Sequence, residues 1–150
     1  MQSRILLLMT ITAITGALLP IQAGVNSRLG KISGGAVTAA FISFLVGTAL
    51  LGAYILISKK QSLQWSGLQT ASLWLFTGGV IGAFYVSAST YIISTLGTAL
   101  TFSLIISGQL IAAMIIDHFG WLGIEVKEIS PGKIAGAILL IAGVVLIRKY

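Results

Sequence analysis

The sequence carries little charge, very few acids and no cysteine. Of its 150 residues 8% are charged, three are acidic and 57% are hydrophobic. A soluble domain usually carries about 25% charged residues. A water-soluble globule of this size could not hide so much apolar side chain, because small domains leave a large share of their surface wet. The composition therefore excludes an ordinary soluble enzyme and a disordered tail, and it indicates an integral membrane protein.

The missing residue types also exclude several kinds of chemistry. Without cysteine there are no disulfides, no thiolate catalysis and no zinc–thiolate sites. The single histidine, His118, cannot build a metal site alone. The chain shows no nucleophile–base–acid set and no phosphate-cradling loop. We therefore expect no enzyme activity, no cofactor and no bound metal.

The nine lysines and arginines are spread between the apolar runs. A nucleic-acid-binding protein would gather them in a stripe. Scattered basic residues next to apolar runs are typical of membrane-flanking anchors, which also contact anionic lipid head groups. We therefore expect membrane lipids as partners, and no nucleic acid.

Five apolar runs are long enough to cross a bilayer, which takes roughly 20 residues. The sequence predicts transmembrane helices over about residues 4–22, 36–57, 72–94, 97–116 and 132–148. The segments between them are short, so we expect an all-α fold with a single transmembrane domain over residues 1–150. The alternative for the first run, a cleaved signal peptide, lacks a clear cleavage site.

Basic residues are nearly balanced between the two sides of the predicted membrane domain. With five spans the termini lie on opposite sides, and the N-terminal side holds Arg4, Lys59, Lys60, Lys127 and Lys133. The other side holds Arg28, Lys31, Arg148 and Lys149. A difference of one gives little orientation bias under the positive-inside rule. We expect insertion in both orientations and an antiparallel homodimer, a ten-helix bundle with inverted symmetry. The alternative is one fixed orientation.

Two amides follow a proline at the end of the first predicted span. Pro20 removes a backbone hydrogen bond and is expected to kink or break the helix. Gln22 and Asn26 are four residues apart, so they share a helical face. A broken helix with two amides on one face would line a substrate cavity. The alternative is a membrane exit with both amides in water.

Further polar residues lie within the third and fourth predicted spans. Tyr85 and Ser89 are four residues apart, and Gln109 is central in the fourth span. Because water is scarce at that depth, the Gln109 amide needs a ligand or a helix partner. We expect Tyr85, Ser89 and Gln109 to bind substrate together with Gln22 and Asn26. For Gln109 a hydrogen bond between helices is an equal alternative.

Acidic residues are absent from the first three predicted spans and from the centre of the fourth. An exporter of lipophilic cations generally needs a buried carboxylate, so this absence argues against cation–proton exchange. Asp117 and His118, at the end of the fourth span, are the one acid–imidazole pair. They are candidates for proton coupling; solvated residues at a helix end are the simpler alternative.

Two glycine pairs have the spacing that lets membrane helices approach closely. Gly78 and Gly82 form one GxxxG pair, and Gly132 and Gly136 form another. We expect both pairs to serve helix packing, with the second as a candidate dimer seam.

Three stretches together resemble the YdcZ-like family of the drug/metabolite transporter (DMT) superfamily. They are GALLPIQAGVNSRLGKISGGAVTAAFISFLVGTALL, TGGVIGAFYVSASTYIISTLGTALTFSLIISGQLIAAMIIDHFGWLG and SPGKIAGAILLIAGVVLI. The family's motif residues are matched by Pro20, Gln22, Asn26, Phe44, Gly47, Gly79, Gly82, Tyr85, Gln109, Asp117 and His118. Many members have proline near Ser94 or Thr95, and this chain has none.

The resemblance implies a five-helix half-transporter, in some members of dual topology, located in the inner membrane of a bacterium. We therefore expect a transporter of a small, neutral or zwitterionic metabolite that works by alternating access as an antiparallel homodimer. Two alternatives stay open. One is an efflux pump for amphipathic cations resembling the small multidrug resistance proteins. The other is a membrane assembly partner that transports nothing.

Overall fold

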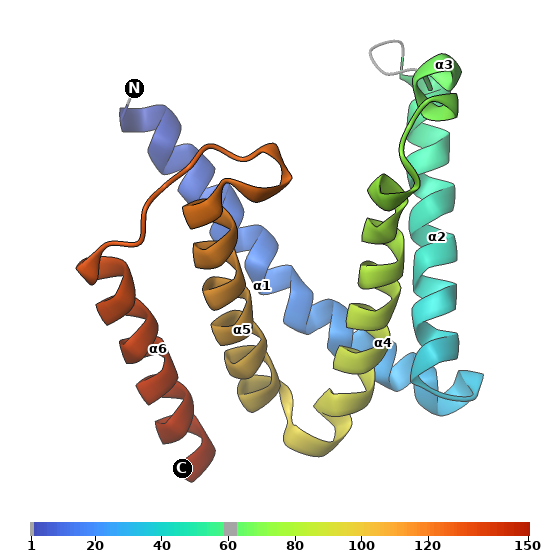
Figure 1. The fold of residues 1–150 in the computed structure, drawn as a ribbon. Coiled ribbons are helices and arrows are strands. Elements are labelled where there is room, and N and C mark those ends of the chain that lie inside the picture. The colour runs from blue at the N-terminus through green and yellow to red at the C-terminus, as the bar shows by residue number, and fades with distance from the viewer. Residues whose placement is uncertain (1, 59–62) are drawn as a thin grey trace. The chain divides into compact units, whose positions relative to one another are not determined.

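The computed structural model describes residues 2–58 and 63–150, which form helices joined by loops (Figure 1). The α-helices are α1 (Gln2–Ser33), α2 (Ala36–Ile57), α3 (Trp65–Gln69), α4 (Thr77–Leu96), α5 (Thr98–Phe119) and α6 (Pro131–Lys149). Two short 3₁₀ helices are η1 (Leu73–Phe76) and η2 (Trp121–Gly123). Within the described residues five helical segments are long and apolar enough to cross a membrane, with η1 and α4 forming one of them. This confirms the predicted number of spans. Lys59 and Lys60 lie outside the described residues.

The first helix is much longer than the sequence predicted. α1 runs without interruption from Gln2 to Ser33, with Pro20 inside it. The predicted break at Pro20 and the predicted end near residue 22 are therefore wrong. Proline removes one backbone hydrogen bond, whereas unwinding the chain in an apolar environment would leave several backbone groups without partners. The 32 residues of α1 span about 48 Å, more than the roughly 30 Å of a hydrocarbon core.

The other spans lie close to their predicted bounds. The second agrees at both ends, from Ala36 to Ile57. The fourth continues three residues beyond the predicted end at 116, to Phe119, where Gly120 caps it in the left-handed conformation. The short helix α3 was not predicted. It lies in the polar segment between the second and third spans.

The chain divides into two compact units, Met1–Thr95 and Leu96–Tyr150. In the first unit α1 packs on α2, and Phe44 of α2 meets α4 at Gly82, where a Cβ would lie 3.5 Å from Cζ of the ring. In the second unit α5 packs on α6. The prediction of one domain over the whole chain stays a prediction.

Three glycines shape the turn between α1 and α2. The N–H of Gly35 donates to the carbonyl of Gly30 at 2.9 Å. Gly34 and Gly35 have φ angles of 95° and 126°, and Gly35, with ψ near 179°, occupies a region that is almost restricted to glycine. A Cβ on Gly30 would lie 3.2 Å from the carbonyl carbon and oxygen of Gly35. The sequence GG at this point therefore sets the close approach of α1 and α2.

Replacing Gly35 with alanine is expected to destabilise the first unit by roughly 1–3 kcal/mol, because the residue would keep a strained backbone conformation. Thermal unfolding of the purified protein in detergent measures the effect. Gly24→Ala is the matched control, since a Cβ there meets nothing within 4 Å and alanine favours a helix. Equal unfolding temperatures for Gly35→Ala and the unchanged protein would contradict this account of the turn.

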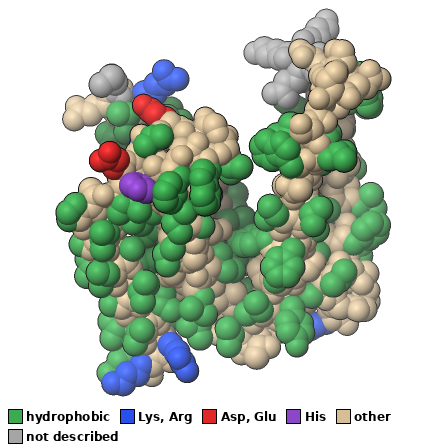
Figure 2. All heavy atoms as spheres, viewed as in Figure 1, with side chains coloured by type: hydrophobic (Ala, Val, Ile, Leu, Met, Phe, Trp, Pro, Cys, Tyr) green, Lys and Arg blue, Asp and Glu red, His purple; other side chains and the backbone are tan. Residues whose placement is uncertain are grey.

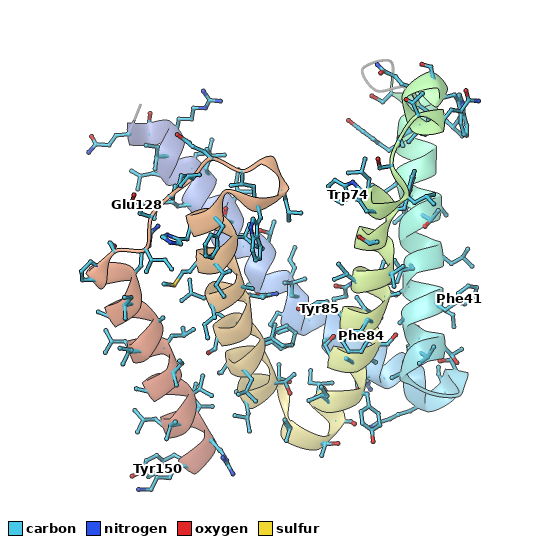
Figure 3. The ribbon with its side chains drawn as sticks, in the orientation of Figure 1. Phe41, Trp74, Phe84, Tyr85, Glu128 and Tyr150 are labelled. Atoms are coloured by element: carbon cyan, nitrogen blue, oxygen red, sulfur yellow. The ribbon has the colours of Figure 1, made fainter. Side chains whose placement is uncertain are left out.

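Burial in the chain is the reverse of that in a soluble protein. The buried apolar residues are few and mostly small: Ala23, Ala39, Ala40, Ile93, Phe102 and Val144. The buried polar residues are Asn26, Ser89, Thr90, Thr101 and Ser107. Large apolar side chains cover the outside of the helices, and charged ones gather toward helix ends (Figure 2). Trp74 and Tyr150 also lie at the ends of their helical segments (Figure 3). This distribution fits helices surrounded by lipid.

Candidate functional site

The buried polar side chains divide into those that are hydrogen-bonded and those that are not. Three hydroxyls donate to carbonyls of their own helices. They belong to Ser89 (to Val86, 3.2 Å), Thr101 (to Gly97, 2.6 Å) and Ser107 (to Ser103, 2.8 Å). The other two residues keep an unpaired atom among the described residues: Nδ2 of Asn26 and Oγ1 of Thr90. Both belong to the first unit, so this unit holds the two groups that most need a ligand.

Asn26 is the best placed of the predicted site residues. It is only 3% exposed and lies on the same helical face as the buried Ala23, three residues before it. Its Nδ2 has no hydrogen-bond partner among the described residues. Leaving a buried donor unpaired costs about 1–3 kcal/mol. A ligand with an acceptor group would remove that cost, so the prediction that Asn26 binds substrate gains support from its surroundings.

Gln22 lies one turn before Asn26 and contributes to a cavity between α1 and α2. The cavity has a volume of about 240 Å³ and is lined by Gln22, Ser43, Phe44, Gly47, Thr48 and Leu51. The alternative of two amides at a membrane exit does not fit, because α1 continues for eleven residues beyond Gln22. Ser43 and Thr48 were missed as lining residues by sequence reasoning. The polar and small residues that recur along α2 were the available signal.

Tyr85 and Ser89 lie on α4, as the sequence predicted (Figure 3 labels Tyr85). Tyr85 is half-buried and Ser89 is 4% exposed. Because the hydroxyl of Ser89 already donates to Val86, it has less capacity for a ligand than its position suggests. Thr90, next to it, is 2% exposed and keeps its hydroxyl unpaired among the described residues. Sequence reasoning singled out Ser89 and missed Thr90.

Gln109 belongs to the second unit and is exposed along α5. The nearby serines of that helix face do not need it as a partner. Ser103 donates to the carbonyl of Ala99 at 2.7 Å, and Ser107 donates to that of Ser103. The participation of Gln109 in a site with residues of the first unit stays a prediction.

Asp117 and His118 end α5 and hold the loop that follows. The backbone carbonyl of Asp117 accepts a hydrogen bond from the N–H of Lys127 at 2.9 Å. Nδ1 of His118 accepts one from the N–H of Ile129 at 3.4 Å. A neutral imidazole in this arrangement carries its proton on Nε2. Both side chains are partly buried, so the alternative of a fully solvated helix end is incomplete, and proton coupling stays a prediction.

The predicted packing glycines differ in what surrounds them. Gly82 lies against the ring of Phe44, as a packing role requires. A Cβ at Gly132 would approach Oγ of Ser130 at 3.9 Å, and within the described residues a Cβ at Gly78 or Gly136 would meet nothing within 4 Å. The packing role of Gly78, Gly132 and Gly136 stays a prediction.

Comparison with known proteins agrees with the resemblance noted from the motifs. Residues 7–146 match the family described as "Putative inner membrane exporter, YdcZ". The chain is similar to Inner membrane protein YdcZ of Escherichia coli (strain K12), with 29% identity over 133 residues, which cover 87% of each protein. No solved structure matches the chain. The chain belongs to the YdcZ family of inner membrane exporters, a family of membrane transport proteins rather than of enzymes, and is a multi-pass protein of the bacterial inner membrane.

Proposed function

We propose that this protein exports a small neutral or zwitterionic metabolite across the inner membrane by alternating access, as a dual-topology antiparallel homodimer. The observation that carries the proposal is the buried, unpaired amide of Asn26 in an apolar helix of a chain from an exporter family. Polar groups at membrane depth are costly and are retained where they line a substrate path. The proposed site adds Gln22, Tyr85, Ser89 and Gln109.

The residues available to the site determine the class of substrate. Amides and hydroxyls donate and accept hydrogen bonds without net charge. The chain's three acids are Asp117, Glu125 and Glu128, which lie in the last turn of α5 and in the loop before α6. A permanently cationic substrate would therefore find no counter-charge within the other spans. This favours a metabolite with hydroxyl, carbonyl or amide groups over a quaternary ammonium compound.

The dimer in this proposal supplies the second half of the transporter. Five spans per chain are an odd number, and basic residues number five on one side and four on the other. Such a chain has little to orient it. Two oppositely inserted copies would reproduce the inverted repeat that many transporters contain within one polypeptide, with the substrate near the midplane.

A screen by thermal shift in detergent tests the proposed substrate class. The purified protein is heated with metabolites and, separately, with lipophilic cations. We expect an uncharged or zwitterionic compound to raise the unfolding temperature, because a ligand that binds the folded state stabilises it. A compound that does so is then tested for flux in proteoliposomes. Stabilisation by quaternary ammonium compounds alone would contradict the proposal and favour a cation pump. No flux of any stabilising compound would favour an assembly partner.

A further inference from the structure

A second cavity of the first unit lies where α1 ends, α2 begins and α4 ends. Its volume is about 220 Å³, and its lining residues are Ser27, Gly30, Lys31, Gly35, Ala36, Thr90, Tyr91 and Ser94. None of the residues proposed for metabolite binding lines it. The cavity is smaller than the roughly 300–1,000 Å³ typical of pockets for drug-sized ligands. It therefore has room for a compact chemical group.

Thr90 supplies this cavity with an unused hydroxyl. The residue is 2% exposed, and its Oγ1 has no hydrogen-bond partner among the described residues. The neighbouring hydroxyl of Ser94 differs, because it donates to the carbonyl of Tyr91 at 2.6 Å. A buried hydroxyl is normally paired. The state of Thr90 therefore points to a ligand that accepts a hydrogen bond inside the cavity.

The remaining lining groups give the cavity a positive potential. Lys31 is the one charged residue in the lining. The N-terminus of α2 also opens here: Gly35 has no side chain to cap the helix, and the first turn contains no acid. The first N–H groups of a helix lack intrahelical partners and carry partial positive charge. A lysine, a helix N-terminus and a hydroxyl donor together form the chemical surroundings of a bound oxyanion.

The position of the cavity along the helices identifies the source of that oxyanion. Lys31 lies in the last turn of α1, and Ser94 lies two residues before the end of α4. Helix ends of a multi-pass protein lie at the membrane surface, at the depth of lipid head groups. Basic pockets between helices at this depth bind anionic head groups. We propose that this cavity binds the phosphate group of an anionic phospholipid, through the Thr90 hydroxyl, the Lys31 ammonium and the N-terminus of α2.

Binding of phosphatidylglycerol to the purified, delipidated protein, followed by native mass spectrometry in detergent, tests this site. Lys31→Gln and Thr90→Val are each expected to weaken binding by about tenfold, the loss of one charge-assisted or buried hydrogen bond. Arg28→Gln is the matched control. It removes the same charge from the same helix end, at an exposed position that does not line the cavity. Its affinity is expected to stay within about twofold. Equal losses for Arg28→Gln and Lys31→Gln would overturn the proposal, because they would show diffuse charge attraction.

Two further measurements distinguish a bound lipid from a structural hydroxyl and from a soluble oxyanion. Thr90→Ser retains the hydroxyl and is expected to bind the lipid like the unchanged protein, and Thr90→Val is expected to unfold at the same temperature as that protein without lipid. A lower lipid-free unfolding temperature for Thr90→Val would give the hydroxyl a structural role and overturn the proposal. Inorganic phosphate is expected not to displace the lipid at millimolar concentration. Displacement would reassign the site to a soluble oxyanion.

Discussion

Metabolite flux through Asn26→Ala is expected to fall by roughly 5- to 100-fold, with little change in stability. The reason is that Asn26 keeps a buried amide donor unpaired among the described residues. A hydrogen bond to the substrate is worth about 1–3 kcal/mol when its absence leaves a buried group unsatisfied. Removing an unpaired donor from the free protein breaks no bond, so its unfolding temperature should be nearly unchanged. Flux in proteoliposomes and thermal unfolding in detergent measure the two effects.

Thr15→Ala serves as the control for this prediction. Thr15 lies on the same helix, is exposed, and its hydroxyl donates to the carbonyl of Ile11 at 3.0 Å. Its removal should leave flux unchanged. Unchanged flux in Asn26→Ala would remove Asn26 from the site. A joint loss of flux and stability would assign it a structural role instead.

Orienting every copy the same way is expected to abolish transport almost completely. The double substitution Arg148→Gln with Lys149→Gln leaves five basic residues on the N-terminal side and two on the other. This bias should orient nearly all molecules with the N-terminus in the cytoplasm. Without oppositely inserted partners the antiparallel dimer cannot form, so flux should fall to the background of empty liposomes. Both residues end α6 and are exposed, so folding should be retained.

The opposite bias provides the rescue. Substituting Arg4, Lys59 and Lys60 with glutamine leaves two basic residues on the N-terminal side and four on the other. This variant should also be inactive alone, with the reverse orientation. Co-expression of the two variants should restore flux, because each supplies the partner that the other lacks. Full activity of either variant by itself would exclude the antiparallel dimer as the transporting unit.

The sequence predicted the spans better than it predicted the first helix end. Apolar length and the flanking Gly35 located α2 at both ends, because hydrophobicity alone decides where a membrane helix lies. Pro20 is a weaker helix breaker here than its residue type suggests. A proline interrupts a helix readily in water, where solvent replaces the lost bond, whereas an apolar environment penalises unwinding more than a single missing bond.

The candidate site was predictable only where one helix determines it. The helical spacing of Gln22 and Asn26 sufficed to single out both amides, since neighbours on one helix face follow from sequence. The cavity at Lys31 and Thr90 was missed, because it depends on how close α1 lies to α4. Ser89 was singled out by spacing, yet its hydroxyl bonds to its own helix. That choice of hydrogen-bond partner is made by local geometry that the sequence pattern does not encode.

Insertion in two orientations is the central claim, and the absence of cysteine from the chain makes its measurement direct. Tyr150→Cys introduces a unique thiol at a position that is 95% exposed. A membrane-impermeant maleimide is added to intact spheroplasts, and a permeant one follows after lysis. We predict that about half of the molecules react from outside, as near-equal basic flanks require. Labelling of all molecules, or of none, before lysis would contradict the account.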